Sequence, residues 1–411
     1  MSAIYKHSFL TIAASAAPGD QAGFLGERKI LPGRKLKADI PCLPHRVVEM
    51  RQIHDPNARR SQTDLQENPL NARAWAFQEH LVPARFLDFC SSETTWECKR
   101  ATWSEGGFEV KSIGYNSIYR KEYQQNLEDG DPDTLYQFWA YRILTEYAPL
   151  KISFEADRLS ALSAVASEMQ QRTGDKYLAG LWAGDLLRGL TWFSGFRSLG
   201  WLPAEYRAPS WSWASIESTR LLFDFGYDSR PEFVSKGLTA VVLEAECQPV
   251  GVSLTGRVQG GFITLRGRWC RQILHFGRES YPTSASPDES SDYYFLEGLP
   301  GTGSVELGEF RPDTTLEVRS YQAAGGMTRQ YLQRSRLRHS VEAGLNINHP
   351  VYCVGIAEQT NGWCDTFTFL VLDHAEGKED TYQRLGLAYI SSTYVPSGWI
   401  KSMEVSDFTI V

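Results

Sequence analysis

The spacing of hydrophobic and polar residues predicts an α/β arrangement at the start of the chain. An apolar, β-branched run at 8–14 (SFLTIAA) predicts a buried strand. Apolar residues at helical spacing predict a helix over 72–82, which Pro83 ends because proline cannot continue a helix. Two short apolar runs on either side of a polar turn predict a β-hairpin over 85–98. We therefore expect residues 1–105 to form part of an α/β unit.

Beyond this unit the pattern changes from helical spacing to alternation. Residues 106–230 are expected to form a helical middle region, with helices over 133–148 and 155–172. The second helix has an apolar stripe that should be buried, namely Leu159, Leu162, Val165, Ala166 and Met169. Residues 231–411 alternate apolar with polar positions and predict an antiparallel β-domain, either a sheet or a small barrel. Two inserts, a low-complexity loop and a basic segment, interrupt this domain at 281–292 and 329–339. The predicted fold class is α/β plus β.

Composition narrows the class of protein. The 411 residues are 42% hydrophobic and 22% charged, which is ordinary for a globular protein with a large core. A formal net charge of -7 gives no electrostatic reason to expect nucleic acid as a partner. No apolar run approaches the roughly 18 residues of a membrane-spanning helix. Seven cysteines without a CxxC pair predict reduced thiols and no zinc site. These features predict a soluble, cytoplasmic protein.

Short motifs of common enzyme classes are missing from the sequence. No HExxH, P-loop, GxSxG or GxGxxG pattern occurs, so metal, phosphate-loop and serine-hydrolase chemistry have no sequence signal. The predicted helix over 72–82 offers a different candidate. Trp75 and Glu79 are four residues apart and would lie on one face of this helix.

Several patches resemble, in order, the fungal heterokaryon-incompatibility (HET) domain proteins. The patches are SFLTIAASAA, ARAWAFQEHLVPARFLDFCSSETTWEC, LSALSAVASEM, DKYLAGLWAGDLLRGLTWF and YRAPSWSWAS. The tail FLVLDHAEGKEDTYQRLGLAYI also resembles the C-terminal region of such proteins, so the resemblance extends over most of the chain. Two family segments that precede the LTIAA strand, one with Ser-Tyr-x-Trp-Gly and one with Trp-Ile-Asp-Ser-x-Cys, do not occur here. We therefore expect a HET domain truncated at its N-terminal half.

The family is a distant relative of the Toll/interleukin-1-receptor (TIR) fold, some members of which hydrolyse NAD. In those enzymes a glutamate follows a tryptophan by four residues on a helix, and Trp75 and Glu79 match that spacing. The resemblance implies Glu79 as a catalytic carboxylate, with Arg73, Trp75 and Ser15 beside it and NAD as its ligand. Such a carboxylate would stabilise the oxocarbenium-like state as the glycosidic bond breaks. In the structural alternative, Glu79 pairs with Arg73 or Arg85 and anchors the helix on the hairpin.

Further aromatic residues are candidates for a pocket or for the core. On the strand TTWEC, Trp96 and Glu97 point to opposite faces, and the face of Trp96 is expected to lie in the core. In YRAPSWSWAS, Trp211 and Trp213 share one side if the segment is extended. They would either wall an apolar pocket, with Arg207 reaching an anionic group, or clamp two domains together.

Three functions remain open at this point. The first is fungal nonself recognition and programmed cell death, through binding or cleavage of NAD at Glu79. The second is a cofactor-free cyclase or pericyclase of secondary metabolism, which would enclose a hydrophobic intermediate in a deep aromatic pocket. The third is a non-catalytic subunit that associates with a protein partner or with itself. An exposed, unpaired strand edge beside LTIAA would support the third function.

Overall fold

The chain forms two compact units, and each is described by itself. The computed structural model describes residues 2–25, 34–37, 47–50, 66–91, 93–105, 120–195, 200–223, 234–280, 290–297, 306–314, 316–318, 320–321, 331–332, 341–342, 348–360, 364–378 and 380–411. Unit 1 comprises Met1–Phe138, Leu150–Ser153 and Ala161–Thr173. Unit 2 comprises Trp139–Pro149, Phe154–Ser160 and Gly174–Val411. The division into three domains at 105 and 230 stays a prediction.

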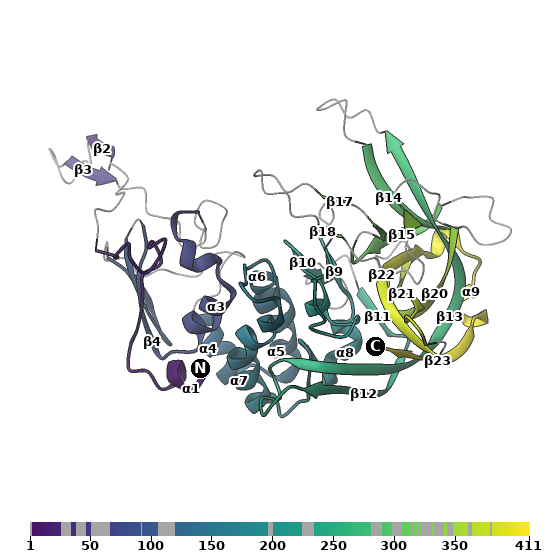
Figure 1. The fold of residues 1–411 in the computed structure, drawn as a ribbon, viewed down its shortest axis with the longest axis horizontal. Coiled ribbons are helices and arrows are strands. Elements are labelled where there is room, and N and C mark those ends of the chain that lie inside the picture. Colours follow the sequence, from purple (N-terminus) through teal and green to yellow (C-terminus); the bar gives the residue numbers. More distant parts are fainter. Residues whose placement is uncertain are drawn as a thin grey trace. The chain divides into compact units, whose positions relative to one another are not determined.

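A four-stranded sheet in the order β1-β4-β5-β6 forms the frame of unit 1 (Figure 1). Its strands are β1 (Thr11–Ala13), β4 (Arg85–Phe89), β5 (Thr94–Cys98) and β6 (Thr102–Ser104). Strands β1 and β4 are parallel, and helix α3 (Ala74–Leu81) comes between them along the chain. Strands β4 and β5 pair antiparallel, which confirms the predicted hairpin. The unit therefore contains a strand–helix–strand connection that ends in a hairpin.

Helices α3, α4 and α7 pack on one another in unit 1. The helices of this unit besides α3 include α1 (Ser2–Lys6), α4 (Arg120–Asp129), α5 (Pro132–Phe138) and α7 (Ser163–Thr173). The α7 helix begins at Ser163 and not at 155 as predicted, because two short 3-10 turns precede it. The side chain of Gln78 accepts the backbone N–H of Ala164 at 3.1 Å and so satisfies one free donor of the first turn. All five residues of the predicted apolar stripe are buried.

The helix predicted over 133–148 forms as three consecutive segments with different hydrogen bonding. They are α5, a π-helical turn (Trp139–Leu144) and α6 (Thr145–Tyr147). The hydroxyl of Thr145 donates to the carbonyls of Ala140 at 3.2 Å and Tyr141 at 2.6 Å. This hydroxyl reaches back four and five residues, so it supplies a donor where the wider π turn changes the backbone pairing.

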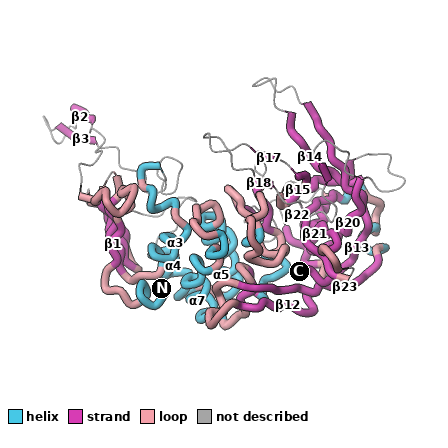
Figure 2. The backbone as a smooth tube through the Cα atoms, in the orientation of Figure 1, coloured by secondary structure: helices cyan, strands magenta, loops and turns pink. Residues whose placement is uncertain are grey.

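Unit 2 is built on a nine-stranded sheet whose strand pairing closes on itself (Figures 1 and 2). The pairing runs through β13 (Val258–Ser280), β14 (Ser290–Glu297), β15 (Glu306–Pro312), β22 (Thr381–Ser391), β21 (Asp365–His374) and β20 (Asn348–Thr360). Strand β20 then pairs again with β13. The sheet is extended by β11 (Val234–Leu238), β12 (Val241–Pro249) and β23 (Glu404–Ile410). The pairings are antiparallel, as predicted, except for the short parallel contact of β22 with β23.

The interior of the closed sheet is apolar. It is filled by buried side chains that include Leu274, Leu296, Phe310, Val351, Cys353, Phe369, Val371, Leu385 and Ile390. Fully burying one Leu, Ile or Phe side chain of this kind contributes about 1.5–3 kcal/mol. Strand β21 contributes Phe369 and Val371 to this core, and its intervening residues Leu370 and Leu372 are buried as well, so both faces of this strand are covered. Most of the inserts predicted at 281–292 and 329–339 lies outside the described residues.

A tight turn in unit 2 collects aromatic side chains around Gly180. This residue joins β7 (Tyr177–Leu178) to β8 (Leu181–Trp182) with a φ of +101° that favours glycine. The Gly180 carbonyl accepts the indole N–H groups of Trp139 at 2.9 Å and Trp213 at 3.1 Å. A Cβ atom at this position would lie 2.4 Å from Nε1 of Trp213. The turn therefore depends on the absence of a side chain.

Helices and mixed sheets together confirm the α/β mixture expected from the sequence. Among the described residues, none of the helices has both the length and the apolar character needed to cross a membrane.

Candidate functional site

Glu79 occupies the second turn of α3 and is half-buried, as is Trp75 one turn earlier. The hydroxyl of Tyr5 on α1 lies against the Glu79 carboxylate. Burial, the negative charge of Glu79 and a hydrogen bond to it raise the pKa of Tyr5 to about 12. Tyr5 therefore keeps its proton well above neutral pH, and its hydroxyl is a donor beside the carboxylate.

The two arginines that the sequence offered as partners of Glu79 lie elsewhere. Arg73 is exposed, and its backbone forms a bridge with Lys151. Arg85 donates to the carbonyl of Phe9 at 3.2 Å, and its guanidinium lies 4.7 Å from the centroid of the Phe9 ring. Among the described residues, no ion pair joins either arginine to Glu79. Among the described residues, neither arginine therefore anchors Glu79.

Ser15 lies just after the carboxyl end of β1 and is buried. Its hydroxyl donates to Oδ1 of Asn71 at 3.4 Å, and its carbonyl accepts the N–H of Leu70 at 3.3 Å. Both partners belong to the 3-10 turn Pro69–Ala72 that precedes α3. Glu79 lies eight residues beyond Asn71, in the second turn of α3. Ser15 thus positions the start of α3, whereas Tyr5 contacts its later turn.

His80, the residue after Glu79, forms a buried pair with Glu97 that no motif in the sequence indicated. His80 and Glu97 are 3% and 0% exposed, and Nε2 of His80 lies 3.0 Å from both carboxylate oxygens of Glu97. Glu97 pairs across the hairpin with Phe86, whose ring packs edge-on against His80 at 4.9 Å. The expectation that the Trp96 face of β5 lies in the core is wrong: Glu97 is buried and Trp96 is half-buried. The carboxylate of Glu97 is stable on the buried face of β5 because the imidazole ring of His80 forms a hydrogen bond with it.

Arg120 closes the end of the helix that carries Glu79. Its guanidinium donates to the carbonyls of His80, Leu81 and Pro83 at the end of α3 and lies 5.1 Å from the ring centroid of Phe86. The last carbonyls of a helix have no partner within the helix and carry partial negative charge, so a buried cation is favoured there. Arg120 and the His80–Glu97 pair therefore fix the end of α3.

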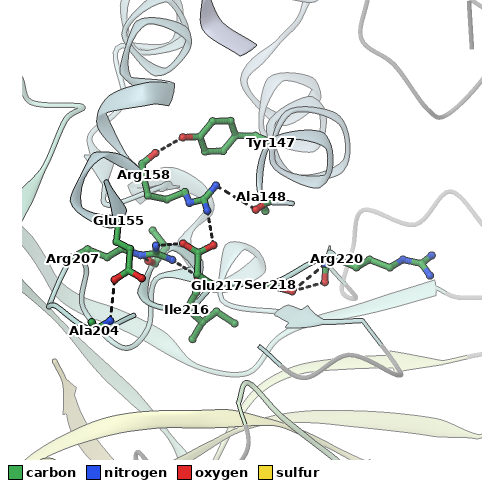
Figure 3. A network of polar contacts seen from close by, with 11 residues as sticks. Tyr147, Ala148, Glu155, Arg158, Ala204, Arg207, Ile216, Glu217, Ser218 and Arg220 are labelled. Atoms are coloured by element: carbon green, nitrogen blue, oxygen red, sulfur yellow. Dashed lines mark hydrogen bonds and ion pairs between the residues drawn. The ribbon is translucent and has the colours of Figure 1, made fainter. Parts of the chain in front are cut away.

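In unit 2, Arg207 is part of a buried polar network (Figure 3). Arg207 and Arg158 each donate to a different oxygen of the Glu217 carboxylate. Arg207 also donates to the carbonyls of Ala214 and Ile216. Burial alone would raise the pKa of Glu217, but the two guanidinium charges outweigh it and hold the pKa below its usual value. The guanidinium donors of Arg207 are therefore used in hydrogen bonds within unit 2.

Trp211 and Trp213 lie inside unit 2, at 0% and 2% exposure. The indole N–H of Trp213 donates to Gly180, and the carbonyl of Trp211 accepts the indole N–H of Trp192 at 2.8 Å. The segment is not extended throughout, because Trp213–Ser215 form a 3-10 turn capped by Ser212. These are packing contacts within unit 2. The clamp between two domains and the ligand pocket both stay predictions.

The candidate site therefore consists of the Glu79 carboxylate on α3, with Tyr5 and Trp75 near it. Among the described residues, no group of three or more His, Cys, Asp or Glu side chains is placed to hold a metal ion. Comparison of the chain with protein-family models, with curated proteins and with solved structures returned no match.

Proposed function

We propose that Glu79 is the carboxylate of an NAD-cleaving centre in a partial TIR-like unit, and that the chain is a HET-type protein of fungal nonself recognition and cell death. The resemblance of the sequence supports this assignment. The strand–helix–strand connection β1–α3–β4, with β1 parallel to β4, is the local arrangement that such a unit requires.

The observation that carries the proposal is the environment of Glu79. Its carboxylate is half-buried, is held by the protonated hydroxyl of Tyr5, and lies one turn from Trp75. Among the described residues no arginine or lysine forms an ion pair with it. A carboxylate held by a neutral donor keeps its negative charge available for a ligand, whereas an arginine partner would neutralise that charge.

The chemistry asked of Glu79 is the stabilisation of positive charge. The bond between the anomeric carbon of the ribose and the nicotinamide nitrogen breaks, and its electron pair stays with the nitrogen. The ribose then carries oxocarbenium-like charge, which a nearby carboxylate stabilises. Water adds to the anomeric carbon and releases a proton to solvent. Tyr5 would hold the Glu79 carboxylate in place, and the ring of Trp75 would offer an apolar surface for nicotinamide.

Nicotinamide release from NAD by the purified chain tests this function. Glu79→Gln should lower the rate by about 100-fold or more, which is typical for the loss of one charge-stabilising group. The matched control is Glu168→Gln. Glu168 is also a half-buried helical glutamate, and it accepts the hydroxyl of Tyr123 at 2.9 Å. Equal losses in the two variants would indicate a folding effect, and turnover that survives in Glu79→Gln would exclude Glu79 as the catalytic carboxylate.

A second candidate function is association through a sheet edge. Strand β1 lies at the end of the sheet order in unit 1, and among the described residues it pairs with β4 alone. Ile12 at the centre of β1 is 57% exposed, and Phe9 just before it is 79% exposed. An edge strand with exposed apolar side chains is a template for another strand. This edge supports an interaction role beside the catalytic one. No contact among the described residues favours the cyclase alternative.

A further inference from the structure

Two cysteines face each other across the seam that closes the sheet of unit 2. Cys270 on β13 and Cys353 on β20 are directly opposite in the antiparallel register. Strand β13 also pairs with β14, so its pairing with β20 is the contact that completes the ring of strands. A covalent bond between these two cysteines would therefore link the first and last strands of the closed sheet.

The separation of opposite residues suits a covalent link. Directly opposite residues of an antiparallel pair have Cβ atoms about 4.5–5.5 Å apart. A disulfide needs Cα atoms about 4.4–6.8 Å apart and Cβ atoms about 3.5–4.5 Å apart. A small approach of the two strands is therefore enough to bring the sulfurs of Cys270 and Cys353 to bonding distance.

The two thiols differ in a way that assigns them separate roles. Cys353 is fully buried in the apolar core beside Val351 and Val371, whereas Cys270 is half-buried. The amide of Gln272 donates to the sulfur of Cys270 at 3.6 Å. A hydrogen bond from Cys353 lowers the pKa of Cys270, against the effect of burial. The same contact, together with burial, raises the pKa of Cys353 well above its usual range. Cys270 is the more accessible thiol and would meet a peroxide first, and Cys353 faces it from the core.

We propose that Cys270 and Cys353 form an oxidative modification site, in which a small hydroperoxide converts the facing thiols into a disulfide across the β13–β20 seam. The sulfur of Cys270 attacks the terminal peroxide oxygen, the O–O bond breaks, and water or an alcohol leaves. Cys270 is then a sulfenic acid. The sulfur of Cys353 attacks that sulfur and displaces water. Two thiols lose two electrons and two protons in total, and the peroxide is reduced by the same two electrons.

The link would change the stability of unit 2 and not its fold. It would close a covalent loop that contains β14 and β15, because both strands lie between the two cysteines in sequence. A cross-link of this kind restricts the unfolded chain and so stabilises the folded one. We expect the oxidised form to unfold at a higher temperature than the reduced form, and the difference to disappear on reduction.

Peptide mapping of the intact chain after treatment with hydrogen peroxide tests the proposal. Remaining thiols are alkylated under denaturing conditions, and the digest is compared with and without a reductant. The expected product is a linked peptide pair containing Cys270 and Cys353, lighter than the two free peptides by two hydrogen atoms and separated by reduction. Sulfinic or sulfonic acid at Cys270 without a link would overturn the proposal, as would full alkylation of both cysteines.

Variants separate this pair from the other thiols. Cys247→Ser is the matched control, because Cys247 lies on β12 of the same sheet and burial raises its pKa to about 12. It should leave the linked peptide and the thermal shift intact. Cys270→Ala should abolish both. If peroxide still raised the unfolding temperature of Cys270→Ala, the shift would have another source and the proposal would fail.

Discussion

At the scale of single residues, the pair His80–Glu97 explains how unit 1 accommodates a carboxylate in its interior. A buried charge is costly unless it is paired and hydrogen-bonded, and here both oxygens of Glu97 meet the same ring nitrogen at 3.0 Å. The pair lies against Phe86, whose ring also faces Arg120. This buried group therefore supports the helix end next to Glu79.

Removal of one partner should destabilise the chain markedly. Glu97→Ala should lower the free energy of unfolding by about 3–5 kcal/mol, because it leaves His80 buried without its carboxylate. Cys98→Ala, at the next position of the same strand and half-buried, should cost about 1 kcal/mol. Chemical denaturation of both variants measures the difference. A loss for Glu97→Ala no larger than that for Cys98→Ala would show that the pair does not support unit 1.

The sequence could place Glu97 and Trp96 on opposite faces of a strand, but it could not say which face is buried. Alternation has a period of two and is symmetric between the faces. The choice is made by His80, which lies 17 residues away on a helix. The placement of Trp75 and Glu79 on one face of α3 needed only their helical spacing. Its partner Tyr5 had no signal, because the contact joins two separate helices.

At the scale of elements, the local sequence patterns predicted most of the helices and strands, but few of the residues at which they begin and end. The hairpin β4–β5 and the strands of unit 2 follow from alternation and turn residues. The late start of α7 and the π-helical turn Trp139–Leu144 depend on hydrogen bonds from Gln78 and Thr145, which spacing does not encode. The sequence left open a sheet or a small barrel and could not choose between them, because closure depends on long-range pairing: the long strand β13 pairs with β12, β14, β20 and β23 in turn.

The edge of β1 should mediate self-association if it is an interaction surface. Ile12→Lys should shift the chain toward monomer in sedimentation or light-scattering measurements, because charge on an edge strand blocks pairing with another strand. The matched control is Trp103→Lys. Trp103 is the central residue of β6, the opposite edge of the same sheet, and is 46% exposed. A wild-type chain that stays monomeric at all concentrations, or an equal effect of both variants, would contradict the role of β1.

At the scale of the whole molecule, ion pairs join segments that are far apart in sequence. In unit 2, Arg384 forms a bidentate pair with Asp313 at 2.9 Å and donates to the carbonyls of Leu190 and Trp192. Arg158, Arg207 and Glu217 connect three further segments (Figure 3). These pairs are nearly or fully buried, so they are screened little by salt and depend on the charge of their carboxylates.

The Glu217 network should make the stability of the chain depend on pH in the acid range. The folded pKa of Glu217 lies below its unfolded value, so its contribution is fully present above the unfolded pKa and is lost as pH falls through the folded pKa. Glu217→Gln should therefore lower the unfolding temperature most at neutral pH, and the gap to wild type should narrow as the pH falls through the acid range. The exposed Glu205→Gln serves as control and should show no gap. A gap independent of pH would contradict the charge-based account.

The central claim is that the negative charge of Glu79 drives cleavage of a dinucleotide. The most direct measurement is the rate of nicotinamide release from NAD by the intact chain, compared with Glu79→Gln and Glu79→Asp in one assay. We predict turnover by the wild type, loss of about 100-fold or more in Glu79→Gln, and a smaller loss in Glu79→Asp, which keeps the charge one methylene further away. Absence of nicotinamide release by the wild type, or equal rates in wild type and Glu79→Gln, would contradict the claim.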